Sequence, residues 1–261
     1  MTSCCNHLTR LLLALALLGA GCAERRDPAP PVQVAASAGS AQRITEALAS
    51  DPEVEALIAP YRQQMEETMS EVLALCPVEM RTAHPEGNLG ALVADIVLDR
   101  ARRDADVPVA ACVVNNGGLR TRWSPGEITL GLVYELMPFD NEISLLRLSA
   151  RQVETLADQL ADRRGEPVAG LSFVIQDGRA SGLEIGGEPV SGGDYWIATN
   201  DYLAGGGGGM PVLWEPQEVR RTGILVRDAI ADAVRAWGER KSGEGPGSIP
   251  EPSMGRIRSA D

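Results

Sequence analysis

Histidine is scarce in this sequence, whose 261 residues include only His7 and His84. A dinuclear hydrolytic centre draws on several His, Asp and Asn ligands, so it cannot be built from imidazoles here. A Ser, His and Asp triad would depend on His84 as its base, which we do not expect. The glycine run at residues 205–209 also lacks the Lys-Ser or Lys-Thr that follows the glycines of a P-loop. We therefore predict no catalytic residue and no metal site in this chain.

Positive charge is also in short supply, since 24 Lys and Arg residues face 36 Asp and Glu residues and the net charge is -12. Proteins that bind nucleic acid present basic patches to the phosphate backbone, so this balance argues against such a partner. An acidic surface of this kind favours solubility outside the cytoplasm.

The sequence has no apolar run long enough to cross a membrane at its amino terminus. The run at residues 11–20 follows Arg10 and is about half the length that the hydrocarbon core requires, which predicts a signal peptide over residues 1–21. Small residues directly before Cys22 resemble the lipobox of bacterial lipoproteins, which implies a lipid anchor on that thiol. An ordinary secretory signal is the alternative. By resemblance to known sorting rules, Ala23 then implies export to the outer membrane, facing the periplasm.

Cysteine use fits an exported protein. Of the five cysteines, Cys4 and Cys5 lie in the predicted signal peptide and Cys22 is the predicted lipid site. Cys76 and Cys112 are therefore the only candidates for a disulfide. Because Cys112 lies in an apolar strand, we favour buried free thiols and keep the disulfide as the alternative.

The remaining chain divides by composition. Residues 22–42 are rich in Pro, Ala, Ser and Gly and read as a disordered tether after the lipid site. Residues 43–238 are long enough for one domain with a substantial core. Residues 239–261 are predicted to be a mostly flexible tail, apart from a candidate strand at residues 256–258.

A helix should begin at Asp51, which can cap it, with Pro52 in the first turn. Apolar residues then recur at spacings of three and four, and we expect this stripe to pack on the core, with a partner surface as the alternative. The stripe comprises Val54, Leu57, Ile58, Tyr61, Met65, Met69 and Val72.

Helices and strands alternate irregularly along the rest of the chain. Helices are predicted over residues 88–105, from the capping box at 149 to 161, and from Thr222 onward. Strands are predicted over residues 109–115, 142–148, 171–176, 182–185 and 195–200. Hairpins among them favour an α/β (α+β) fold with a mixed β-sheet covered by helices over a doubly wound parallel sheet.

Four separated motifs, in this order, resemble the C-terminal, substrate-binding domain of the 5'-nucleotidase family. With the last helix, they span residues 81–236. The motifs are Gly87-Asn88-Leu89-Gly90, Asn115-Asn116-Gly117-Gly118-Leu119-Arg120, Met137-Pro138-Phe139-Asp140-Asn141 and Ala198-Thr199-Asn200-Asp201-Tyr202-Leu203-Ala204.

The resemblance implies a substrate site in which a nucleobase stacks between two aromatic rings, here Phe139 and Tyr202. The alternative is that either ring fills the core. Asn115 and Arg120 match the two ends of a family motif, and Arg supplies the donor fork that a phosphate or sugar oxygen requires. A surface ion pair is the alternative for Arg120. By the same resemblance, the remaining substrate-facing residues are Asn141 and Arg81.

The sequence departs from the family at Gly208, where the resemblance implies an Asp that accepts hydrogen bonds from ribose. Without that acceptor, the site should discriminate ribose poorly. Either the ligand is not an ordinary ribonucleotide, or Asp140 or Asp201 substitutes, or the site has decayed to a scaffold.

The resemblance also implies a metallophosphoesterase domain before this one, for which we expect no counterpart in this sequence. We therefore expect the specificity half of a split nucleotide-hydrolysing system, with divalent metals in a separately encoded partner. The helix that begins at Asp51 is the candidate docking surface. The alternatives are an envelope lipoprotein that binds nucleosides without catalysis and a structural or interaction lipoprotein on a decayed scaffold.

Overall fold

The computed structural model describes residue 45 and residues 49–240 and 245–260. The chain divides into a unit of residues 1–50 and a folded unit from Asp51 to Asp261. The predicted signal peptide, the lipid site at Cys22 and the tether all lie outside the described residues. Within the described ranges, no helix is both long and apolar enough to cross a membrane.

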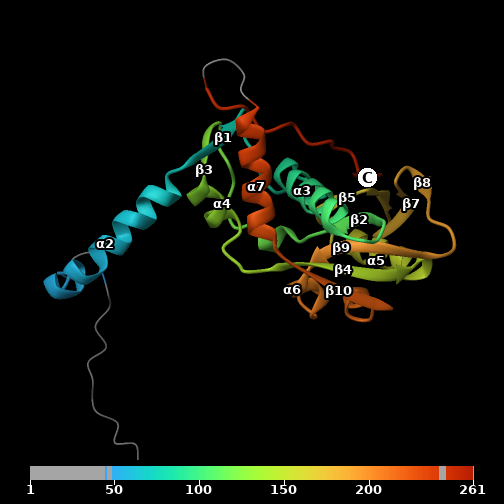
Figure 1. Cartoon of the computed structure of the whole chain (residues 1–261). Helices are drawn as coiled ribbons and strands as arrows, with labels where there is room; N and C mark the ends of the chain where they lie inside the picture. The colour runs from blue at the N-terminus through green and yellow to red at the C-terminus, as the bar shows by residue number, and fades with distance from the viewer. Residues whose placement is uncertain (1–44, 46–48, 241–244, 261) are drawn as a thin grey trace, which may run out of the picture. The chain divides into compact units, whose positions relative to one another are not determined.

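A five-stranded sheet forms the centre of the folded unit, in the order β10-β4-β9-β2-β5 (Figure 1). Strands β2 and β9 are parallel, and the other neighbours are antiparallel, so the sheet is mixed. The strands are β2 (Val109–Val113), β4 (Glu142–Ser149), β5 (Val168–Ala169), β9 (Asp194–Asn200) and β10 (Glu218–Leu225).

Helices cover both faces of this sheet. Alternate residues of each strand point to opposite sides, so each face carries apolar side chains that pack against helices. Leu145 packs in one core cluster with residues of α3 (Asn88–Asp104) and α7 (Val226–Glu239). Leu146 packs in a second cluster with residues of α5 (Ala150–Asp162). The predicted mixed α/β architecture with helical cover is confirmed.

Two smaller sheets complete the unit. The first pairs β1 (Val72–Cys76) with β3 (Gly126–Thr129), which leads into α4 (Leu130–Leu136). The second has the order β11-β6-β7-β8, in which the hairpin predicted around Asp177 and Gly178 joins β6 to β7. Its strands are β6 (Leu171–Gln176), β7 (Arg179–Ile185), β8 (Glu188–Pro189) and β11 (Ile257–Ser259).

The last helix begins later than the sequence indicates. Residues 218–225 form β10, and α7 therefore begins at Val226 instead of Thr222. The strand lies at the edge of the central sheet with alternating exposure, and its Thr222 hydroxyl donates to the carbonyl oxygen of Ile143. That residue caps no helix, because its side chain bonds to the neighbouring strand.

The helix capped by Asp51 is α2 (Pro52–Met69), and its predicted start is confirmed by the bond from the Glu53 N–H to the Asp51 carboxylate. The expectation that its apolar stripe packs on the core is wrong. No residue of α2 is buried, and Leu57 and Tyr61 are each 68% exposed. The helix contacts α4 near its carboxyl end and leaves most of the stripe without a partner in the described unit.

The described part of the carboxyl-terminal segment is packed on the domain, although its composition predicts a mostly flexible tail. The Ile249 side chain is 3% exposed, and its N–H donates to the carbonyl oxygen of Leu75 in β1. The expected strand at residues 256–258 is present as β11, which pairs in parallel with β6. Arg256 anchors it by donating to Asp95 at 2.6 Å and to the Val168 carbonyl oxygen at 2.6 Å.

Cys76 and Cys112 are both buried free thiols, as favoured above, and the alternative disulfide is not formed. Burial raises the pKa of each thiol, most strongly for Cys112, so both favour the protonated form.

Candidate functional site

Five of the six predicted site residues line one pocket of about 370 Å³, together with Gly117 and Gly118. They are Asn115, Arg120, Phe139, Asn141 and Tyr202. We call this space the aromatic pocket. The sheet explains the convergence. Parallel β2 and β9 end next to each other and lead into the loop of Asn115 and the short helix of Tyr202. Antiparallel β4 begins at the same end, where Ile143 pairs with Asn200, and so brings in the loop of Phe139.

Both aromatic rings of the pocket are open to solvent. Phe139 is 40% exposed and Tyr202 is 51% exposed, so neither ring fills the core. The glycine run packs closely on Tyr202, because a Cβ on Gly207 would lie 2.4 Å from the ring atoms Cε2 and Cζ. Only glycine can approach the ring so closely, and the glycine backbone therefore backs the ring at this position.

A buried amide connects two of the site loops. Asn200 is nearly inaccessible, and its Oδ1 accepts the Leu203 N–H at 2.8 Å to cap the short helix α6 (Asp201–Ala204). Its Nδ2 donates to Asn115 Oδ1 at 3.4 Å. Asn200 therefore orients Asn115 while it shapes the turn that carries Tyr202. The motif containing Asn200 is evident in the sequence, but this role is not.

Arg120 reaches the pocket without a carboxylate partner. Its Nη1 donates to the Gly117 carbonyl oxygen at 3.2 Å, and no ion pair to it occurs within the described ranges. The alternative interpretation of Arg120 as half of a surface ion pair is therefore not what the structure contains. Its remaining donors are available to an anionic ligand.

Arg81 lies outside the aromatic pocket, in an adjoining recess of about 350 Å³ that Arg120 also lines. The first motif holds this segment, because Asn88 Oδ1 accepts the Arg81 N–H at 2.8 Å. Arg122, which pairs with Glu79 at 3.4 Å, contributes a third guanidinium to the recess. The aromatic pocket thus has a basic neighbour in an acidic protein.

Neither carboxylate named as a substitute at the ribose position lines the aromatic pocket. Asp140 pairs with Arg227 of α7 at 2.7 Å, and this pair ties the Phe139 loop to the helix. Asp201 accepts the Glu142 N–H at 3.1 Å. At Gly208 itself no side chain fits, because its φ is +70° and a Cβ would lie 2.3 Å from Leu203 Cδ2.

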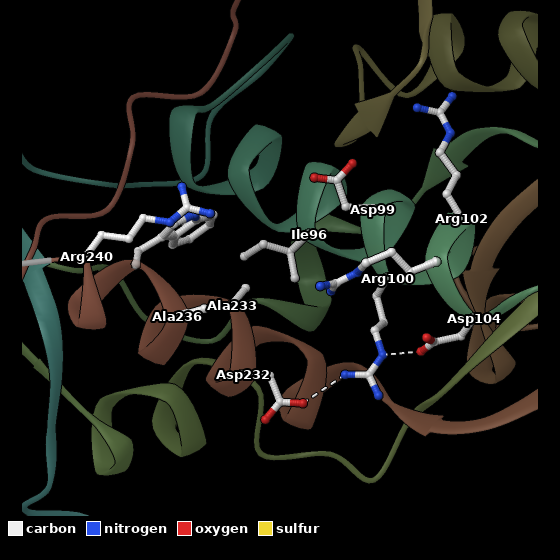
Figure 2. Close-up of a pocket in the computed structure, with 11 residues that line it drawn as sticks. Ile96, Asp99, Arg100, Arg102, Asp104, Asp232, Ala233, Ala236 and Arg240 are labelled. Atoms are coloured by element: carbon white, nitrogen blue, oxygen red, sulfur yellow. Dashed lines mark hydrogen bonds and ion pairs between the residues drawn. The ribbon is translucent and has the colours of Figure 1, made fainter.

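A larger groove lies between α3 and α7, and Figure 2 shows the charged side chains that line it. Arg100 donates to Asp232 at 2.8 Å and also pairs with Asp104, so much of this charge is internally neutralised. None of the predicted site residues lines the groove. We therefore place the candidate site at the aromatic pocket.

Metal-ligating side chains are not grouped in the part of the chain that the structure describes. No set of three or more His, Cys, Asp or Glu residues there is arranged to hold an ion.

The residues that line the aromatic pocket lie in a part of the chain that is similar to known proteins. Residues 69–215 match the family model described as 5'-nucleotidase, C-terminal domain. The trifunctional nucleotide phosphoesterase protein YfkN of Bacillus subtilis (strain 168) is 26% identical over 230 residues, which are 80% of this chain and 16% of that protein. A 5'-nucleotidase of Vibrio cholerae is 24% identical over 211 residues, covering 76% of this chain and 37% of the relative.

A solved structure gives the same picture of the fold. The 5'-nucleotidase precursor from Thermus thermophilus aligns with a TM-score of 0.65 at 26% identity, over 79% of this chain and 42% of that one. This chain therefore matches less than half of the length of each of these three relatives.

Proposed function

This chain belongs to the 5'-nucleotidase C-terminal domain family, and on that premise we propose that its aromatic pocket binds nucleosides and nucleotides. The observation that carries the proposal is the convergence of three separate motifs on one pocket. It holds two exposed rings and a guanidinium that pairs with no carboxylate among the described residues. Nucleobases offer π faces to such rings, and stacking contributes about 1 to 3 kcal/mol per base.

The neighbouring recess suggests how a nucleotide would lie. The base would occupy the space by Phe139 and Tyr202, and Asn115 and Asn141 would offer amide donors and acceptors to it or to the sugar. A phosphate would then meet Arg120, with Arg81 beside it in the recess. Because the pocket lining contains no carboxylate, sugar hydroxyls would contribute little to selectivity.

We further propose that this protein is the specificity half of a split nucleotide-hydrolysing system. The metal ions and the attacking water would belong to a separately encoded metallophosphoesterase. The longer relatives, a nucleotide phosphoesterase and a 5'-nucleotidase by name, support a link to such chemistry. Export and a lipid anchor on Cys22, with attachment at the outer membrane, are part of the same proposal.

The docking surface proposed for that partner is the α2 apolar face, formed by Ile58, Tyr61, Met65 and Met69. These side chains line one groove on a helix that buries none of its residues. The helix ends at Met69, where the match to the family begins, so it directly precedes the matched domain. An exposed apolar patch of this kind is typical of a protein interface.

Calorimetric titration of the purified protein with adenosine 5'-monophosphate (AMP) tests the binding proposal. Phe139→Ala and Tyr202→Ala should each weaken binding by roughly fivefold or more, the effect of one lost stacking face. Phe173→Leu, at a buried ring that does not line the aromatic pocket, is the control that should leave affinity unchanged. Absence of any AMP binding by the unchanged protein would favour a decayed scaffold over a working site.

A second experiment separates the split enzyme from a binding lipoprotein without catalysis. The tagged protein is purified from its native membranes, and co-purifying proteins are identified by mass spectrometry. A metallophosphoesterase recovered at near-equal amount, and a rise in AMP turnover when it is added, would support the split enzyme. Recovery of the protein alone, with AMP binding intact, would instead support a binding lipoprotein.

A further inference from the structure

A buried carboxylate lies behind the site loops without lining the aromatic pocket. Glu166 is only 4% exposed and occupies the turn between α5 and β5. A carboxylate in such a place is costly unless its oxygens are paired with donors. Its partners therefore indicate what the turn is built to hold.

The two oxygens of Glu166 bind different parts of the molecule. Oε2 accepts the backbone N–H of Asn116 at 2.7 Å. Oε1 accepts from Arg163, at 2.9 Å from Nη2 and 3.3 Å from Nε. One oxygen thus holds the loop that carries Asn115 and Arg120, and the other holds a guanidinium of its own turn.

The same turn also lies against three further segments near the site. The Gly165 carbonyl oxygen accepts from His84 Nδ1 at 2.8 Å, close to the segment of Arg81. The Pro167 carbonyl oxygen accepts the Val114 N–H at 3.0 Å, just before the Asn115 loop. Arg163 reaches the glycine run after Tyr202, because a Cβ on Gly209 would lie 3.3 Å from its Nη1.

We infer that Glu166 is a positioning residue, which fixes the loop of Asn115 and Arg120 so that the Arg120 guanidinium meets the anionic group of the ligand. This inference rests on the proposed nucleotide binding. Glu166 lines neither the aromatic pocket nor the adjoining basic recess, so it acts through the loop and not by touching the ligand. Arg163 neutralises the buried charge and links the loop to the glycine run.

The Glu166→Gln substitution tests the inference. A glutamine has one acceptor oxygen, and its amide group would present N–H donors to the second partner, so either the Asn116 or the Arg163 contact is lost. We expect the affinity for AMP to fall roughly tenfold, which corresponds to the loss of one charge-assisted hydrogen bond between Arg120 and the phosphate. Adenosine lacks the phosphate, and Asn200 still orients Asn115, so the affinity for adenosine should change by less than about twofold. Glu154→Gln, at an exposed carboxylate of α5, is the matched control.

The ratio of AMP to adenosine affinity separates positioning from a merely structural role. A structural role lowers the melting temperature but leaves that ratio unchanged in the folded protein, and this result would overturn the inference. Hydrogen exchange of residues 114–120 without ligand should also accelerate in Glu166→Gln and not in Glu154→Gln. If Glu166→Gln does not fold, Arg163→Gln at a 35% exposed side chain must show the same fall in the ratio. Failure of the unchanged protein to bind either ligand would instead refute the proposed function, and the inference with it.

Discussion

Replacing Gly207 by alanine tests whether the glycine run shapes the ligand site through the Tyr202 ring. The new Cβ would lie 2.4 Å from Cε2 and Cζ of the ring and 2.6 Å from Cε1. Carbon atoms in contact are normally about 3.5 to 4.0 Å apart, so the methyl group and the ring must separate by roughly 1 Å or more. The backbone of Gly207 is not in the left-handed region, so alanine suits its conformation and the ring is the part that must move.

Because Tyr202 is half-exposed, its ring can rotate away without disturbing the core. We expect the free energy of unfolding of Gly207→Ala to change by less than about 1 kcal/mol. Loss of one stacked face should weaken AMP binding by about 1 to 3 kcal/mol, which is roughly five- to 150-fold in Kd.

The assay is calorimetric titration with AMP alongside urea unfolding, for the unchanged protein, Gly207→Ala and Gly192→Ala. Gly192 is a matched control, because its new methyl group would meet open space and its backbone also lies outside the left-handed region. An AMP affinity of Gly207→Ala within about twofold of the unchanged protein would refute the role of Gly207. So would an equal loss of affinity in the control.

Three further predictions concern stability. Burial raises the pKa of the Asp95 carboxyl despite its bond to Arg256, so the folded state binds the proton more tightly than the unfolded state does. The unfolding free energy should therefore rise relative to that of Asp95→Asn as pH falls from 7 through the folded pKa, and urea titrations that give a pH-independent difference would contradict this. Ile249→Ala should cost about 2 to 5 kcal/mol in the same assay, whereas a flexible tail would show almost no loss. Leu57→Gln on α2 should change stability by less than about 0.5 kcal/mol, and a large loss would show that this helix face is covered in solution.

The sequence predicts which residues line the aromatic pocket better than it predicts what supports them. Phe139 and Tyr202 stand within short motifs, and those motifs fix both the residue types and their order. Glu166 lies 50 positions from the loop that it holds, and nothing in the local pattern of either segment indicates the contact. Asn200 could have been suspected of capping, because an Asn that ends a strand before a helix is a common start signal.

Local patterns are least informative where distant packing decides the outcome. The spacing of apolar residues in α2 shows that one face is apolar, but it does not show what covers that face. The composition around Ile249 favours flexibility, yet a strand about 170 residues earlier offers it backbone partners and a buried position. Thr222 has the chemistry of a helix cap, but pairing of β10 with β4 gives its hydroxyl another acceptor.

The packing of the carboxyl-terminal segment has a consequence for how this protein is made. Leu75 of β1 donates its N–H to the Gly247 carbonyl oxygen and accepts the Ile249 N–H, and the ribosome adds these two residues about 170 positions later. Contacts between such distant positions form slowly, because a long loop must close before they contribute. The domain therefore cannot complete its core until Ile249 has been synthesised. For a chain that is exported as proposed, this delay would help to keep it unfolded until translocation.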